Sequence, residues 1–407
     1  MFFSGYALFL SLLLVLSHTT TAQVNPSRVI VNNTITLPIA KRFNFTGSTT
    51  LLQHDQGRVR RLRARATGTL SAPSPELSSV EVTNELVQYF VEVFTGPSTQ
   101  ALSHELRIDI GSSNTWVSDY QNTQTTRMTR NTMSLEYGNG AMMVGPEFAD
   151  RIMLGEEPGL EVLGQFIGIA ASSSGFDNVG GVLGLGPTAL TVGTLSPDTT
   201  AMIPTVTDNL FAQAVIPSEV VSISFAPTLS NPNGELTFGG IDSTKFIGEL
   251  VASPITRTSP SSLFFGIEQS VRYGQATTLL TGNPGIFDSD ALDAYVAATG
   301  AVFDEATGFY RITPAQYANL QSMFFTINGG VFEFTANAQI WPRSLNSLIG
   351  GSSSFVYLII GDIGTPSGSG LDIINGMMFM ERFYTVFDTG RNEIAIANTQ
   401  FTTATTN

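Results

Sequence analysis

The chain has 407 residues, 13% of them charged, with 33 acidic and 19 basic side chains and no cysteine. This length allows two core-bearing domains, and the many Gly, Ser, Thr and Phe residues favour an all-β protein over a helical or disordered one. The absence of cysteine excludes disulfides and thiolate chemistry. Three scattered histidines, His18, His54 and His104, argue against a metal centre and a Ser-His-Asp triad.

The N-terminus has the pattern of a secretion signal. Residues 6–16 form an apolar run, and Thr20-Thr-Ala22 provides small residues for cleavage before Gln23. The run is too short to span a bilayer comfortably, and no later run is apolar enough to do so. We therefore predict a signal peptide over residues 1–22 and a secreted, extracellular protein without a membrane partner.

Charge divides the rest of the chain in two. Residues 23–66 contain eight of the basic side chains and one acid, Asp55, so the remainder carries a large negative charge. A basic segment ahead of an acidic body is attracted to it as long as the carboxylates are ionised. Arg58-Val-Arg-Arg-Leu-Arg-Ala-Arg65 could instead bind nucleic acid, but this is the weaker interpretation for an exported acidic protein, and no nucleic-acid partner is expected.

The first motif with catalytic potential follows a predicted strand over residues 87–93. Leu106, Ile108 and Ile110 alternate with Arg107 and Asp109, which indicates a second strand. Gly-Ser-Ser at 111–113 ends it and leaves Asp109 beside hydroxyl and N–H groups that favour its ionised form. Taken alone the motif is ambiguous, because an Asp before Gly-Ser-Ser is more often a turn residue than a catalyst.

The later elements continue the pattern of short strands and turns. Residues 133–145 predict a hairpin whose turn contains Tyr137-Gly-Asn-Gly140. The glycine-rich run 180–187 suits close backbone packing and lacks the features of a phosphate loop. Residues 205–214 predict a helix with Asp208 near its start, and residues 234–242 predict a strand and turn.

The second half repeats this plan in weaker form. Gly285-Ile-Phe-Asp288 parallels the strand that ends in Asp109, and residues 371–379 parallel the run that begins at Val182. Two such halves would form two lobes, each contributing one strand-end aspartate to a central cleft.

The segment Ile108-Asp-Ile-Gly-Ser-Ser-Asn-Thr-Trp-Val117 resembles the first active-site motif of pepsin-type aspartic proteases, specifically the secreted polyporopepsin-like fungal group. The likeness extends from about Val87 to Asn407. It implies an all-β, bilobal pepsin-like fold with a few short helices, acting as a monomer on protein or peptide substrates without cofactor or metal. It also implies a basic propeptide over residues 23–82 and lobes over residues 83–240 and 241–407.

The resemblance also assigns roles to individual residues. Asp109 and Asp288 would share one proton and activate a water molecule, because two carboxylates in contact do not both ionise readily. The substrate-binding residues would be Tyr137, Gly138 and Gly140 of a flap, together with Ser112 and Trp116. Ser112 would hydrogen-bond the Asp109 carboxylate, and Trp116 would form the flap contact with Tyr137. Asp388, although followed by Thr-Gly, falls in a C-terminal strand and turn of the family and is not expected to be catalytic.

Two departures from the family pattern bear on activity. Ile110 replaces a threonine whose hydroxyl reaches the other lobe. Asp288 runs directly into Ser289-Asp-Ala291, where the family has a Thr-Gly-Thr/Ser-Thr turn and an apolar run. Three interpretations remain: an acid endopeptidase, a catalytically impaired relative that at most binds peptides, or a β-rich adhesin or carbohydrate-binding protein. No motif supports the third, which also does not explain the paired Asp strands. The first is preferred, and the choice between the first two depends on whether the block after Asp288 is truly missing.

Overall fold

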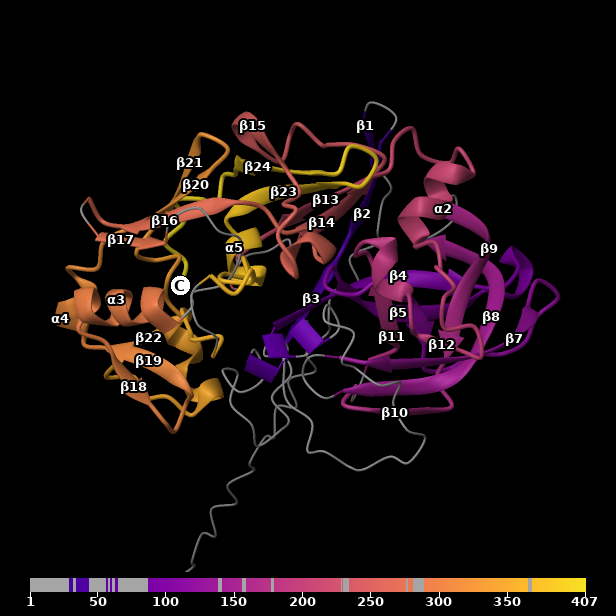
Figure 1. Ribbon diagram of the computed structural model, residues 1–407, viewed down its shortest axis with the longest axis horizontal. Helices are drawn as coiled ribbons and strands as arrows, with labels where there is room; N and C mark the ends of the chain where they lie inside the picture. Colours follow the sequence, from indigo (N-terminus) through magenta and orange to yellow (C-terminus); the bar gives the residue numbers. More distant parts are fainter. Residues whose placement is uncertain are drawn as a thin grey trace, which may run out of the picture.

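The computed structural model describes residues 29–31, 34–43, 56–57, 59–60, 63–64, 87–137, 141–155, 159–176, 179–227, 229, 234–275, 277–280, 289–364 and 368–407. It shows two β-rich lobes joined by a shared sheet (Figure 1). The expected all-β, bilobal architecture with short helices is confirmed. Among these residues no helix is both long enough and apolar enough to cross a bilayer.

The first lobe is a ten-stranded sheet in the order β12-β7-β8-β9-β6-β11-β5-β4-β3, with β10 paired to β8. Its strands are β3 (Ala40–Phe43), β4 (Val87–Thr95), β5 (Leu102–Asp109), β6 (Trp116–Val117), β7 (Arg127–Glu136), β8 (Met142–Leu154), β9 (Leu160–Ile169), β10 (Ser172–Ser174), β11 (Gly181–Gly184) and β12 (Leu195–Ser196). The predicted strand at 87–93 and both strands of the flap hairpin are therefore confirmed.

A seven-stranded sheet connects the lobes in the order β1-β2-β14-β13-β23-β24-β15. Its strands are β1 (Val29–Val31), β2 (Thr34–Pro38), β13 (Val220–Phe225), β14 (Gly234–Phe238), β15 (Ile247–Pro254), β23 (Phe383–Asp388) and β24 (Glu393–Asn398). Strands from the N-terminal basic segment, the middle and the C-terminus thus lie in one sheet. Sequence periodicity did not indicate that β2 and β3 would pair with the body of the protein.

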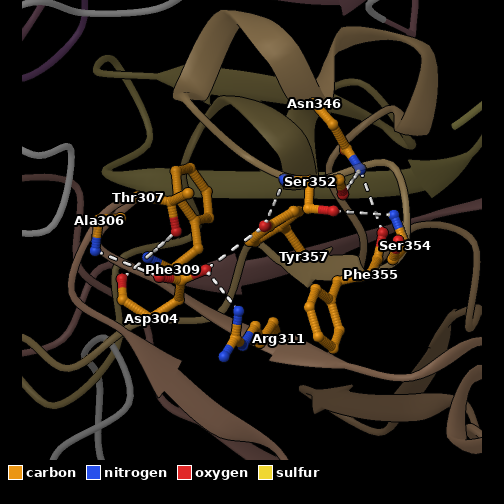
Figure 2. Close-up of polar contacts among 10 residues, drawn as sticks. All are labelled: Asp304, Ala306, Thr307, Phe309, Arg311, Asn346, Ser352, Ser354, Phe355 and Tyr357. Atoms are coloured by element: carbon orange, nitrogen blue, oxygen red, sulfur yellow. Dashed lines mark hydrogen bonds and ion pairs between the residues drawn. The ribbon is translucent and has the colours of Figure 1, made fainter.

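The second lobe contains a four-stranded sheet, β17-β16-β20-β21, and a three-stranded sheet, β18-β19-β22. The bounds are β16 (Gln269–Tyr273), β17 (Thr277–Leu280), β20 (Met323–Ile327), β21 (Gly330–Phe334), β18 (Val302–Asp304), β19 (Phe309–Ile312) and β22 (Val356–Leu358). Figure 2 shows how Asp304 ties the smaller sheet together, accepting hydrogen bonds from Arg311 (3.2 Å) and Tyr357 (3.4 Å). The Arg311 guanidinium also lies 4.2 Å from the centroid of the Phe355 ring.

The helices are short. The described residues contain α2 (Val206–Ala212), α3 (Ser289–Thr299), α4 (Pro314–Tyr317) and α5 (Met377–Met380), with 3-10 turns η1 (Ser98–Gln100), η2 (Thr188–Thr191), η3 (Ser261–Leu263) and η4 (Arg343–Ile349). In α2, the predicted helix, Thr205 and Asp208 form a capping box that satisfies two N-terminal N–H groups.

The internal repeat is less regular than its sequence suggested. In the first lobe, β11 forms a strand between β5 and β6. In the second lobe, the matching residues 371–376 belong to no strand, although Leu371 and Ile373 are buried. The apolar sequence therefore places this segment in the core, but it makes none of the strand pairings that β11 makes.

Candidate active site

Asp109 is the last residue of β5, and its backbone is fixed by the neighbouring strand. Gly184 of β11 lies opposite Asp109 in parallel register, and the Leu185 N–H donates to the Asp109 carbonyl at 2.8 Å. A Cβ on Gly184 would lie 2.5 Å from the backbone carbon of Ser113. The glycine-rich run therefore packs backbone against backbone, as predicted, and leaves little freedom in the turn after Asp109.

The Asp109 carboxylate accepts two hydrogen bonds from that turn. The Gly111 N–H donates to Oδ1 at 2.9 Å, and the Ser112 hydroxyl donates to Oδ2 at 2.8 Å. Donors aimed at both oxygens stabilise the ionised form. The expected contact between Ser112 and Asp109 is present, and the pair can present an oriented carboxylate to a water molecule.

An aromatic cluster of Trp116, Tyr137 and Phe176 covers this part of the lobe. The Trp116 indole N–H donates to the Tyr137 hydroxyl at 2.8 Å, which is the predicted flap contact. The Phe176 ring meets both others edge-on, with centroids 4.8 Å from Trp116 and 5.0 Å from Tyr137. This geometry is typical of favourable aromatic packing and fixes the tyrosine where the flap strand β7 ends.

Burial and the charge of Asp109 keep the Tyr137 hydroxyl protonated. Burial raises the pKa of this phenol most strongly, and the nearby negative charge of Asp109 raises it further. A protonated phenol can donate a hydrogen bond at any pH at which an aspartate pair works. Tyr137 therefore lies near enough to Asp109 to respond to its charge, and its proton remains available.

Sequence reasoning missed two residues of this site. Phe176 gave no motif signal, since a lone aromatic in a Gly-Ser-rich stretch is common. Arg107 could have been found from the sequence, because it shares its strand face with Asp109 and a basic residue is unusual in a buried strand. It is only 5% exposed, and its guanidinium lies against the rings of Phe176 and Tyr137.

Not every predicted site residue is placed. Asp288, Gly138 and Gly140 lie outside the described residues, so their roles stay predictions. Ile110 is partly buried and packs against the main hydrophobic core. Asp388 ends β23, accepts a hydrogen bond from the Arg391 N–H at 2.8 Å and forms an ion pair with the same residue, in keeping with a turn.

Three comparisons with known proteins agree with this fold. The profile of the family "Eukaryotic aspartyl protease" matches residues 88–399. Polyporopepsin from Irpex lacteus is 52% identical over 343 residues, covering 81% of this chain and 99% of that protein. Rhizopuspepsin-1 from Rhizopus niveus is 28% identical over 389 residues, covering 89% and 92%.

A solved structure matches as well. The crystal structure of aspartic proteinase from Irpex lacteus is 51% identical, with a TM-score of 0.75 over 79% of this chain and 96% of that one. The fold and the strand-end aspartate define a pepsin-type aspartic protease. The chain belongs to the eukaryotic aspartyl protease family and is an aspartic endopeptidase homologous to polyporopepsin.

Proposed function

We propose that the protein is a secreted, monomeric endopeptidase that cleaves protein substrates at acidic pH through a water molecule held by Asp109 and Asp288. The observation that carries the proposal is the Asp109 carboxylate, held by Gly111 and Ser112 next to Tyr137. An ionised aspartate removes a proton from water, which attacks the peptide carbonyl. The protonated partner aspartate donates to the carbonyl oxygen, and a proton then reaches the leaving nitrogen.

Inhibitor sensitivity tests this proposal. The acid-treated protein, assayed at high enzyme concentration on an unfolded protein between about pH 3 and 5, is expected to give slow cleavage that pepstatin abolishes. Inhibitors of serine, cysteine and metalloproteases should leave the rate unchanged. Cleavage that resists pepstatin, or that is fastest at neutral pH, would contradict the mechanism.

We further propose the division into a signal peptide at residues 1–22, a removable propeptide at 23–82, and lobes at 83–240 and 241–407. Lys41 of β3 supports this, since its ammonium reaches the carbonyls of Ala226 (2.7 Å) and Pro227 (2.8 Å) and lies 3.7 Å from the buried Glu381 carboxylate. Tyr89 also donates to Glu381, at 2.8 Å. The proposed propeptide is thus attached through a buried ion pair.

The first contact joins residues of both lobes, and a second contact involves the C-terminal lobe alone. Short helical pieces at residues 56–57, 59–60 and 63–64 are visible between the two lobes in Figure 1. Val59 is fully buried in a cluster with Ile363 and Leu371, and the Gln56 side chain donates to the Asp362 carbonyl at 3.1 Å. The Arg63 side chain donates to Ser369. The basic segment therefore spans both lobes, as a cleft-covering propeptide must.

Acid is expected to loosen the Lys41 contact. Burial lowers the pKa of Lys41 to about 8, so the ammonium stays charged at all lower pH values. Acidification instead neutralises Glu381 and leaves a buried cation without its counter-charge. Removing one partner of a buried pair costs about 3–5 kcal/mol. Docking of the segment should therefore weaken when acid protonates the carboxylate that faces Lys41.

Mass spectrometry of the secreted protein checks this expectation. After acid exposure the new N-terminus should lie between about Ala64 and Val87. Lys41→Met keeps the apolar stem without the charge, so this variant should release the segment at lower pH than the unmodified chain. A protein that still begins at Gln23 after acid exposure would overturn the proposed propeptide.

A further inference from the structure

Arg107 is a buried basic residue on the strand that carries Asp109. The two faces of β5 differ: Leu106 is fully buried and, with Ile108, packs against the main hydrophobic core. Arg107 and Asp109 share the opposite face, because side chains alternate along a strand. An aliphatic side chain at position 107 would fill the site without burying a charge, so the guanidinium needs a specific compensating interaction.

The aromatic cluster is one group that contacts the guanidinium. The guanidinium carbon lies 5.2 Å from the centroid of the Phe176 ring and 5.7 Å from that of Tyr137. Both distances are within the roughly 6 Å over which a cation is attracted to a ring face. Phe176 in turn packs edge-on against Tyr137 and Trp116. The guanidinium therefore contacts the rings of Phe176 and Tyr137 directly, and Phe176 in turn contacts Trp116.

Tyr137 connects Arg107 to the reaction. Its backbone N–H donates to the Ala141 carbonyl at 2.8 Å, which places it at the turn end of the flap hairpin, next to the last residue of β7. Its hydroxyl accepts from Trp116. The Tyr137 ring contacts a cation, and its hydroxyl accepts a hydrogen bond from an indole, so the side chain has few alternative positions. If the ring turned away, the hydroxyl would leave the neighbourhood of Asp109.

We propose that Arg107 is a positioning residue for proteolysis, holding the Tyr137 ring against Phe176 so that its hydroxyl stays at Trp116 beside Asp109. The catalytic consequence rests on the proposed function, whereas the effect on the aromatic cluster does not. Substrate binding beneath the flap would use this fixed tyrosine. Loss of the cation should therefore weaken substrate binding more than it slows the chemical step.

The first measurement does not need activity. Trp116 and Trp341 are the two tryptophans of the chain, so in a Trp341→Phe background fluorescence reports Trp116 alone. Arg107→Met keeps an unbranched apolar side chain but removes the charge, and it should increase acrylamide quenching of Trp116 about twofold or more. Arg107→Lys should restore most of the protection, since an ammonium is also attracted to aromatic faces. Unchanged quenching in a folded Arg107→Met variant would refute the proposal.

The second measurement is kinetic. We expect Arg107→Met to raise KM about tenfold for a peptide substrate and to change kcat by less than about threefold, with Arg107→Lys close to the unmodified protein. Arg311→Met is the matched control, because Arg311 lies over Phe355 in the other lobe. It should change neither Trp116 quenching nor KM.

A double mutant decides whether Arg107 acts through the tyrosine. In a Tyr137→Leu background, Arg107→Met should have no further effect on KM. A full additional tenfold rise there would contradict the proposed route, as would a kinetic effect without any change at Trp116. If Arg107→Met does not fold, Arg107→Gln takes its place in the same cycle, because the amide removes the charge but keeps a polar side chain. Absence of pepstatin-sensitive activity in the parent chain would count against the proposed function alone, since quenching still tests Arg107.

Discussion

Inserting a Thr-Gly-Thr-Thr block and an apolar run after Asp288 is expected to raise acid, pepstatin-sensitive kcat/KM by on the order of a hundredfold or more. Asp109 shows what such a block does: a glycine turn supplies two donors to the carboxylate, and β11 fixes the backbone behind it. Asp288 is followed directly by Ser289, the first residue of α3. A misplacement of about 1 Å in a preorganised site can cost on the order of a hundredfold in rate.

The second-lobe segment that corresponds to β11 also suggests that Asp288 is poorly positioned. Residues 371–376, which match the region of β11, pair with no strand. The described second lobe therefore lacks the strand that would fix an aspartate as β11 fixes Asp109. Steady-state kinetics on one peptide at pH 3 to 5 would compare the two chains. Equal activity of the chain as written and the repaired chain would show that the missing block is not needed.

The repaired chain also provides the background for testing Asp109. Asp109→Asn should lower kcat by on the order of 100- to 10,000-fold, because the amide cannot take a proton from water. The matched control is Asp388→Asn, since Asp388 is also followed by Thr-Gly but serves a turn with Arg391. It should leave kcat unchanged. Activity that survives Asp109→Asn would remove Asp109 from the mechanism.

His104 is expected to make the fold less stable as the pH falls from 6.5 to about 4. Burial lowers the pKa of this imidazole from 6.5 to about 4, and the charge of Asp119 offsets only part of the effect. The unfolded chain therefore binds a proton in this interval that the folded chain does not. Stability falls by about 1.4 kcal/mol per pH unit, a loss on the order of 3 kcal/mol in total, and the slope ends once the folded protein is also protonated.

Urea unfolding at pH 7 and pH 4 measures this loss. His104→Gln can keep the contact with Thr95, whose hydroxyl lies 2.8 Å from Nε2, but it does not titrate. Between pH 7 and pH 4, the free energy of unfolding of this variant should fall by on the order of 3 kcal/mol less than that of the unmodified chain. Asp119→Asn is the complementary control, because removing the carboxylate should extend the loss to lower pH. An identical pH dependence in His104→Gln would contradict this account.

Local sequence patterns were sufficient to predict many of the strands, turns and helices. Alternation around Asp109 predicted β5, and the glycine-rich run predicted the close approach of β11. The helix predicted over residues 205–214 is present as α2, with Asp208 in its first turn. The contact between Ser112 and Asp109 spans three residues, so the turn sequence alone could indicate it. These features depend on steric and hydrogen-bonding preferences within a few residues.

Other features depended on residues far away in the sequence. Lys41 finds its carboxylate partner at Glu381, and β2 pairs with β14 about two hundred residues later. The alternation of β2 is compatible with any sheet edge, so nothing local could select its partner. For the same reason the sequence parallel between residues 371–379 and the run that begins at Val182 did not reveal that residues 371–376 belong to no strand.

The sequence by itself determined the family, the strand-end position of Asp109 and the absence of thiol chemistry, because these follow from short motifs and composition. Tertiary structure alone decided that Arg107 would be buried against Phe176 and Tyr137, and that His104 would be buried beside Thr95. The physical reason is that burial of a charge or an imidazole depends on which distant side chains surround it, and its free-energy cost is set by those neighbours.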